Sequence, residues 1–383
     1  MALSGIRVVD LTRILAGPFC TLMLADMGAE VIKVEPPKGD PVRGQGVIKE
    51  GLSWYFAQFN RNKKSIVLDL YSEEGKDDLA LVLETADVLV ENYRPGVLAK
   101  MGFGKKHLEE INPRLIHASV NGYGSTGPYV DRPSFDFIAQ AMSGFMSVNG
   151  SADEDPMRAA PPMSDMIAGL YTAFGVVTAL HARHRTGKGQ NVESSLTNGL
   201  ISMMAYLSAE YFATGVIPKR TGNNHPIASP YGLFRASDGR VAVAPSNDVF
   251  VERFLGVLGL RGLLEEDRFK TNDERMKNRE ELLEIINNVT EKKSVEHWIK
   301  VINEGGCPCG RTMDLEEVFG DPQVLSQEMV LNVEHPGRGM VKMTGFPVKL
   351  SETPAQLHRP TPELGADTED ILGPLRAQKR KML

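Results

Sequence analysis

A strand-helix-strand pattern opens the chain and then recurs, and it constrains the fold more than any other feature. Ile6 to Leu11 predicts a strand, Pro18 to Met27 a helix that begins at a proline and ends before Gly28, and Glu30 to Val34 a second strand. Strands that alternate with helices form a parallel sheet covered on both faces. The sequence therefore predicts an α/β fold with ligands at the carboxyl ends of the strands.

The same alternation continues through the next hundred residues. Strands are predicted at Ser65 to Leu70, Asp87 to Glu91 and Leu115 to Val120, and helices at Ser72 to Thr85 and Lys105 to Ile111. The loops that follow the strands are the places to expect a ligand, and they cover residues 12–18, 36–43, 92–96 and 121–128.

Later segments indicate a second, smaller domain. After a strand at Gln190 to Ser194 and a helix at Leu196 to Thr214, the sequence becomes rich in Glu and Lys, as in the predicted helix Asn272 to Thr290. The final part returns to short strands and turns before a helix at Thr368 to Lys379. We therefore expect a large α/β domain at 1–218, a small α+β domain at 219–320, and a segment at 321–383 that returns to the large domain.

Composition excludes several classes of protein. The 383 residues carry a net charge of −6, which argues against a surface made for nucleic acid. The longest strongly apolar stretch, Met166 to Leu180, is too short for the ~20 residues that cross a bilayer, so no membrane segment is predicted. The N-terminus has no secretory signal, and three cysteines without paired spacing indicate reduced thiols. We expect a cytoplasmic protein.

Familiar cofactor and metal motifs are missing. A dinucleotide site needs a G-x-G-x-x-G turn after the first strand, but the chain has Ala16-Gly17-Pro18, whose proline lacks the N–H that a phosphate would use. His181 and His184 have a spacing that could bind a metal, yet no third ligand is nearby, and cations are common in the last turn of a helix. The sequence predicts neither a bound dinucleotide nor a metal.

Asp165 follows a proline-stiffened loop and begins a long apolar run. Two interpretations are open. The residue could cap the N-terminus of a helix, a role that Ser164 could fill equally well. Alternatively, a carboxylate kept ionised by the helix dipole is a usable nucleophile.

Short segments spread over the whole chain carry a further pattern. In order and spacing they resemble the class III coenzyme A transferases, the family of formyl-CoA:oxalate and crotonobetainyl-CoA:carnitine transferases. The segments are Gly17-Pro18-Phe19, Leu24 to Glu35, Asn60 to Ile66, Val90 to Gly96, Gly122-Tyr123-Gly124, Gly127-Pro128-Tyr129, Asp136 to Gly144, Pro161 to Tyr171, Thr186 to Gln190, Asn223 to Pro226, Pro230-Tyr231 and Pro308-Cys309-Gly310.

This resemblance implies a fold and a mechanism. The family has a Rossmann-like large domain, and two subunits interlock as a homodimer. Asp165 occupies the position of the family's nucleophile. Its carboxylate would attack an acyl-CoA to give an aspartyl anhydride, and the released CoA thiolate would then form an aspartyl thioester that the acceptor acid resolves. Coenzyme A is thus a cosubstrate, and no permanently bound cofactor is implied.

The resemblance also implies the residues that contact coenzyme A. For each cation among them, a solvated surface charge is the alternative interpretation. Oxalate-using members carry a glutamine where this chain has Leu15, so another group must stabilise the oxyanion. The implied contacts are Leu15, Ala16, Lys38, Arg43, Leu68, Asn92, Tyr93, Arg94 and Lys100.

Two other functions compete with transfer. The 2-methylacyl-CoA racemases of the same superfamily use a histidine where this chain has Phe135 and a glutamate where it has Asn247, so proton abstraction lacks its acid and base. A CoA-binding protein without catalysis is the third possibility, and the intact Asp165 segment argues against it. We expect a CoA-transferase that uses succinyl-CoA or another small acyl-CoA as donor and a small dicarboxylate as acceptor.

Overall fold

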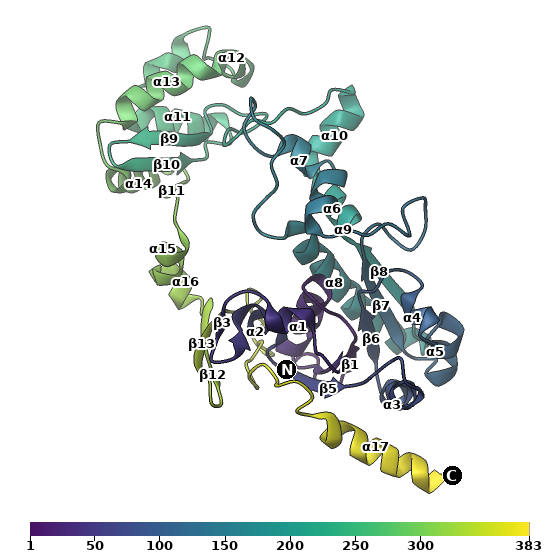
Figure 1. Ribbon diagram of the computed structural model, residues 1–383. Helices are drawn as coiled ribbons and strands as arrows, with labels where there is room; N and C mark the ends of the chain where they lie inside the picture. The colour runs from purple at the N-terminus through teal and green to yellow at the C-terminus, as the bar shows by residue number, and fades with distance from the viewer. Residues whose placement is uncertain (383) are drawn as a thin grey trace. The chain divides into compact units, whose positions relative to one another are not determined.

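The computed structural model describes residues 1–382 and contains two compact units (Figure 1). The first consists of Met1–Phe145, Ala159–Ser208 and the chain from Pro322 onward. The second consists of Met146–Arg158 and Ala209–Asp321. The chain therefore leaves the first unit twice and returns to it each time.

A six-stranded parallel sheet forms the centre of the first unit, which confirms the predicted α/β class. Its order is β5-β2-β1-β6-β7-β8. Successive strands are therefore added toward one edge of the sheet from β1 to β5 and toward the other edge from β6 to β8. Doubly wound folds have this order. The strands are β1 (Arg7–Asp10), β2 (Glu30–Glu35), β5 (Lys63–Val67), β6 (Val88–Glu91), β7 (Ile116–Asn121) and β8 (Asn191–Ser195).

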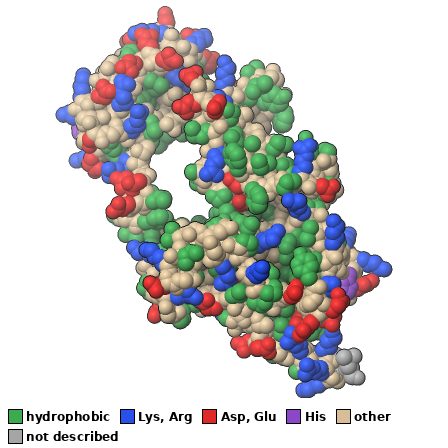
Figure 2. All heavy atoms as spheres, viewed as in Figure 1, with side chains coloured by type: hydrophobic (Ala, Val, Ile, Leu, Met, Phe, Trp, Pro, Cys, Tyr) green, Lys and Arg blue, Asp and Glu red, His purple; other side chains and the backbone are tan. Residues whose placement is uncertain are grey.

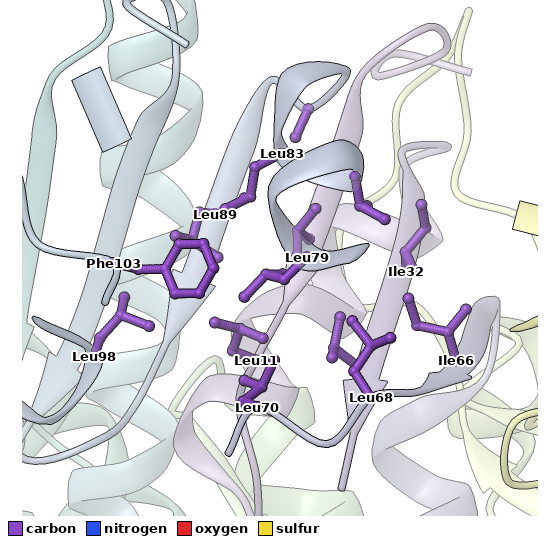
Figure 3. Close-up of a cluster of buried hydrophobic side chains, with 14 of the residues drawn as sticks. Leu11, Ile32, Ile66, Leu68, Leu70, Leu79, Leu83, Leu89, Leu98 and Phe103 are labelled. Atoms are coloured by element: carbon purple, nitrogen blue, oxygen red, sulfur yellow. The ribbon is translucent and has the colours of Figure 1, made fainter. Parts of the chain in front are cut away.

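Helices cover both faces of this sheet. On one face, α1 (Ala16–Asp26) and α8 (Met163–Thr186) bury small and branched side chains against the strands, among them Cys20 and Val176. On the other face, α3 (Glu73–Glu84), α5 (Lys105–Ile111) and α17 (Thr368–Met382) enclose a second apolar cluster. In Figure 3, Leu79 and Leu83 of α3 lie over Ile32, Ile66 and Leu89 of the strands.

Short elements complete the first unit. The helices are α2 (Trp54–Asn60), α4 (Val97–Lys100), α6 (Asp136–Met142), α9 (Leu196–Ser202) and α16 (Pro322–Ser326). Two hairpins are formed by β3 (Ile48–Lys49) with β4 (Leu52–Ser53) and by β12 (Val330–His335) with β13 (Gly339–Thr344). Two further helices, α7 (Phe145–Val148) and α10 (Ala205–Thr214), lie where the chain passes between the units.

The second unit has its own antiparallel sheet and core. Phe234, Phe254, Phe269 and Trp298 are buried between the sheet and its helices. The strands are β9 (Gly232–Ala236), β10 (Gly239–Val243) and β11 (Cys309–Arg311), and the helices are α11 (Asp248–Val257), α12 (Asn272–Lys277), α13 (Arg279–Thr290), α14 (Val295–Glu304) and α15 (Leu315–Gly320).

Helix α8 is longer than its apolar run suggests. It has 24 residues, and an 18-residue window within it has a mean hydropathy of 1.4, so by length and composition it could cross a membrane, whereas the run Met166 to Leu180 indicated too short a segment. Half of its apolar window is buried within the protein, and a core helix has these same properties. The helix ends at Gly187, which adopts the left-handed conformation of a C-terminal cap.

Two predicted long helices are interrupted. The predicted helix Leu196 to Thr214 forms α9 and α10, with Ala205 at a positive φ of 47°. The predicted helix Asn272 to Thr290 forms α12 and α13, because the Asn278 side chain donates to the carbonyls of Glu274 and Arg268 and closes the end of α12. A polar side chain that bonds the backbone competes with helix continuation at such points.

Candidate active site

A cavity of about 190 Å³ opens between β1 and β6, where the order of the strands in the sheet reverses. Strands β1 and β6 are neighbours, but the chain continues from them to opposite sides, so the loops that follow them diverge and leave a crevice. Residues after β1, β6 and β7 line this crevice, and Asp165 from the first turn of α8 joins them.

The structure brings together most of the residues implied by the sequence. Leu15, Ala16, Asn92, Tyr93 and Arg94 line the cavity that contains Asp165. Lys38 and Leu68 line a second cavity of about 440 Å³, whose walls include Val34, Leu70 and Met101. Arg13 and Tyr93 belong to both cavities, so the two adjoin.

Arg43 and Lys100 line neither of these two cavities. The Arg43 guanidinium makes two hydrogen bonds of 2.8 and 2.7 Å with the Glu35 carboxylate, and it lies 3.9 Å from the centre of the Phe56 ring. Lys100 is exposed at the end of α4. Arg43 thus fixes the loop after β2, while Lys100 is in the position of a solvated charge.

Asp165 does not cap its helix, and neither does Ser164. The N-cap position is Pro162, and the first turn is held from outside, because the Asp136 carboxylate accepts hydrogen bonds from the Ser164 backbone N–H and hydroxyl, both at 2.9 Å. No hydrogen bond or salt bridge within residues 1–382 engages the half-buried Asp165 carboxylate. The capping interpretation is therefore wrong, and this carboxylate is left facing the cavity.

The environment of Asp165 raises its pKa to about 7. Burial is the first cause, because it disfavours the charged form, and the negative charge of Asp136 is the second. The expectation that the helix dipole simply keeps the carboxylate ionised is corrected, since these two effects outweigh it. The pKa of Tyr55 in α2 is raised to about 12. Burial is the first cause of this shift, and the nearby Asp165 charge is the second.

Buried ion pairs hold the loop that begins α1. Lys33 of β2 lies 2.9 Å from Asp40 and donates to the Thr12 carbonyl at 2.8 Å. Asp40 in turn accepts from the Ile14 backbone N–H at 3.3 Å. Ile14 has a φ of 70°, a strained conformation for a β-branched residue that persists only where its surroundings impose it. The loop that lines both cavities is thereby fixed.

A second buried ion pair, between Asp10 and Lys63, stabilises the same loop. Asp10 accepts from Thr12 and Thr21 and forms a salt bridge of 3.1 Å with Lys63, and both charged side chains are fully buried. Burial lowers the pKa of Lys63 to about 8, although the Asp10 charge opposes the shift. Removing one member of such a pair costs about 3–5 kcal/mol of stability, since the other charge is left buried alone.

Three arginines give the cavity a positive wall. Arg13, Arg94 and Arg132 all line it, and none of them forms a salt bridge within the described part of the chain. The Arg132 guanidinium lies 3.8 Å from the centre of the Tyr129 ring. Neither Arg13 nor Arg132 was predicted from the sequence, although each lies four residues before a motif segment, and this position was the signal that could have found them.

The positions that distinguish racemases carry no acid or base here. Phe135 lines the cavity and is 65% exposed, and no histidine or second acid is among the residues that line it with Asp165. Asn247 accepts from the Phe250 backbone N–H at 3.0 Å as the N-cap of α11. Within residues 1–382, no group of three or more His, Cys, Asp or Glu side chains is placed to hold a metal ion.

Comparison with known proteins identifies the family. The family model described as CoA-transferase family III matches residues 3–368. Succinate–glutarate CoA-transferase of Agrobacterium fabrum is 36% identical over 99% of this chain and 96% of its own length. Acetyl-CoA:oxalate CoA-transferase of Acetobacter aceti is 39% identical over 91% and 89%.

A solved structure agrees with these matches. A CAIB/BAIF family protein from Brucella suis has a TM-score of 0.87 and 35% identity over 97% of this chain and 99% of its own. Enzymes of the matched family use CoA thioesters as cosubstrates and have no permanently bound cofactor. The family model and these relatives cover both units and the Asp165 cavity, and the chain therefore belongs to CoA-transferase family III.

Proposed function

We propose that this protein moves coenzyme A from a small acyl-CoA to a small carboxylic acid through covalent intermediates on Asp165. The observation that carries the proposal is the Asp165 carboxylate, which faces a cavity with a positive wall and has no hydrogen-bond partner within residues 1–382. A carboxylate with a raised pKa is a stronger nucleophile once it is ionised.

The chemistry divides into balanced steps. An Asp165 oxygen attacks the thioester carbonyl, the carbon–sulfur bond breaks, and CoA leaves as a thiolate while an acyl-aspartyl anhydride forms. The thiolate attacks the aspartyl carbonyl and expels the donor acid as its carboxylate. The acceptor carboxylate then attacks the aspartyl thioester, the carbon–sulfur bond breaks, and a second anhydride and the CoA thiolate form. The thiolate finally attacks the acceptor's acyl carbonyl in this anhydride, which gives the new acyl-CoA and frees the Asp165 carboxylate. No proton changes hands in the sequence.

The two adjoining cavities support a placement for coenzyme A. The larger one has apolar walls suited to adenine, and of its two lysines Lys33 is buried against Asp40 whereas Lys38 is exposed and suited to a phosphate. The cosubstrate would pass Arg13 and Tyr93 to bring its thioester to Asp165. Ala16 begins α1 beside the reacting centre, and the free N–H groups of that first helical turn would stabilise the oxyanion in place of the glutamine that Leu15 replaces.

Succinyl-CoA as donor and a dicarboxylate as acceptor are the substrates we propose. One relative is named for transfer between succinate and glutarate, which are both dicarboxylates. Three arginines and only one acid line the cavity, so an arginine is available to pair with the second carboxylate of a dicarboxylate. Racemisation is not favoured, because Phe135 and Asn247 provide neither an acid nor a base.

We also propose that the protein acts as a homodimer in the cytoplasm. Leu170, Phe174 and Val177 of α8 are 48%, 69% and 45% exposed, and they recur on one side of the helix. Figure 2 shows further apolar side chains at the surface over α6 and α9. An exposed apolar patch of this kind is typical of a subunit interface.

Trapping the intermediate tests the proposed function. The protein is incubated with succinyl-CoA, reduced with borohydride and mapped by mass spectrometry, so that an aspartyl anhydride or thioester appears as an alcohol at Asp165. Asp165→Ala should abolish transfer and labelling while coenzyme A binding persists. Transfer activity in that variant, or no label with any acyl-CoA donor, would exclude the mechanism.

A further inference from the structure

Asp136 is a second buried acid beside the nucleophile, and the steps above do not use it. It begins α6 and is 8% exposed. One of its carboxylate oxygens accepts from the Ser164 backbone N–H and hydroxyl, and the other accepts from the Gln140 amide at 2.7 Å. Three donors directed at one carboxylate stabilise its negative charge.

These contacts fix the backbone from which Asp165 projects. Ser164 is the residue before Asp165, so hydrogen bonds to Asp136 hold the first turn of α8 against α6. Gln140 is fully buried and also accepts from the Ala159 N–H at 2.8 Å, which ties down the chain that leads into α8. Asp136 therefore orients the nucleophile without entering the cavity, because it is not among the residues that line it.

We propose that Asp136 is a positioning residue that aligns Asp165 through Ser164 and, by placing a second negative charge behind it, favours the covalent intermediates over the free carboxylate. The inference rests on the proposed function, since it concerns the nucleophile of that reaction. Formation of the anhydride or the thioester converts Asp165 into a neutral acyl group, and its charge leaves with the CoA thiolate or the donor acid. The repulsion from Asp136 therefore exists only before acylation and after product release.

Several other side chains surround the Asp165 carboxylate. Arg13 and Leu15 come from the loop after β1, Arg94 from the loop after β6, and Arg132 from the chain before α6, and all line its cavity. Tyr55 approaches from α2. Asp136 is the only charged neighbour that contributes to the raised pKa of Asp165, and burial is the larger cause.

The test compares Asp136→Asn with the wild-type enzyme. Asparagine keeps the shape and an oxygen for Ser164 but removes the charge. We expect the acidic limb of the kcat/KM profile to move to lower pH by about one unit or more, and the fraction of enzyme trapped as aspartyl thioester to fall by about tenfold. Difference infrared spectra against Asp165→Asn follow protonation of that single carboxyl without requiring turnover.

Three further variants separate the effect of the Asp136 charge from that of its hydrogen bonds. Asp136→Glu retains the charge and should keep the acidic limb in place, as should Ser164→Ala, which removes one donor to Asp136. Asp136→Ser removes the charge in a second way and serves if the asparagine variant does not fold. An unmoved limb and an unchanged trapped fraction in the charge-removing variants would overturn the role of Asp136, whereas activity retained in Asp165→Asn would instead overturn the proposed function.

Discussion

Gly169 faces the Ala16 carbonyl oxygen so closely that a Cβ on Gly169 would lie 2.5 Å from it. The same Cβ would lie 3.0 Å from the Phe19 ring. Gly169 is one helical turn after Asp165, and Ala16 begins α1, so the missing side chain lets the two helix N-termini approach each other. The distance between the nucleophile and the first turn of α1 therefore depends on this glycine.

Gly169→Ala should impair both folding and catalysis. The added methyl group must push α1 and α8 apart, which we expect to cost about 1–3 kcal/mol of stability despite the better helix propensity of alanine. Because Ala16 moves away from Asp165, kcat should fall more than coenzyme A binding. Thermal unfolding and steady-state kinetics with succinyl-CoA provide the two measurements.

Gly256→Ala is the matched control for that substitution. Gly256 also lies within a helix, α11, but no atom lies within 4 Å of an added Cβ there. Alanine at this position should leave activity unchanged and raise stability by up to about 1 kcal/mol. Equal effects of the two substitutions would show that the approach of α1 to α8 has no special role.

The Asp165→Asn variant should be more stable than the wild type at pH 8 but not at pH 4. The folded-state pKa of Asp165 is about 7, above the ordinary value of 3.8, so the folded protein prefers the protonated carboxyl. That preference contributes stability which is fully present below pH 3.8 and is lost as the pH rises through 7. Asparagine resembles the protonated form at every pH and avoids the loss.

Melting temperatures of the two proteins across this pH range check the prediction. The difference between variant and wild type should grow from about pH 4 to about pH 8, and it should be accompanied by complete loss of transfer. A constant difference over the range would show that burial and Asp136 do not disfavour the Asp165 charge. The expected pattern is the usual conflict between stability and a strained catalytic group.

Local patterns were sufficient to predict the sheet but not the site. The strand β1 and the helix α5 follow from apolar spacing and turn residues, and both occur where the sequence places them. The position of Asp165 at a helix start was also predictable. Its lack of a capping role was not, because the acceptor for the first turn is the carboxylate of Asp136, which lies 28 residues before Ser164 in the chain.

The same limit applies to the charges around the site. Lys33 and Lys63 look like ordinary strand lysines, yet they are fully buried against Asp40 and Asp10. Arg43 looked like a ligand contact, whereas it pairs with Glu35. Which partner a charge meets depends on the sheet register, and a single sequence does not specify this register for side chains that are distant along the chain.

Arg13 and Arg132 should contribute to the binding of different substrates. Arg13 lines both cavities, whereas Arg132 lines the Asp165 cavity and not the larger one. Arg13→Gln should therefore raise the KM for acyl-CoA, and Arg132→Gln should raise the KM for the dicarboxylate, each by about tenfold or more, which is the loss of one charge-assisted hydrogen bond.

The comparison needs a monocarboxylate and a neutral control. Arg132→Gln should discriminate less between glutarate and butyrate than the wild type does, because its contact with the second carboxylate is lost. Arg240→Gln changes an exposed arginine of β10, outside both cavities, and should alter neither KM. If both active-site variants changed only the KM for acyl-CoA, Arg13 and Arg132 would both bind coenzyme A and neither would bind the second carboxylate.

Phe174→Asp should separate the proposed dimer into single chains. Phe174 is 69% exposed on the apolar side of α8, so a charge there would be solvated in an isolated chain but buried and unpaired in an interface. Light scattering should give twice the mass of one chain for the wild type and the mass of one chain for the variant.

Met340→Asp places the same charge on an exposed apolar position of β13 and should leave the mass unchanged. Because the substitution keeps the core of the first unit intact, the circular dichroism spectrum should be retained, and a wild-type protein with the mass of one chain would refute the dimer directly.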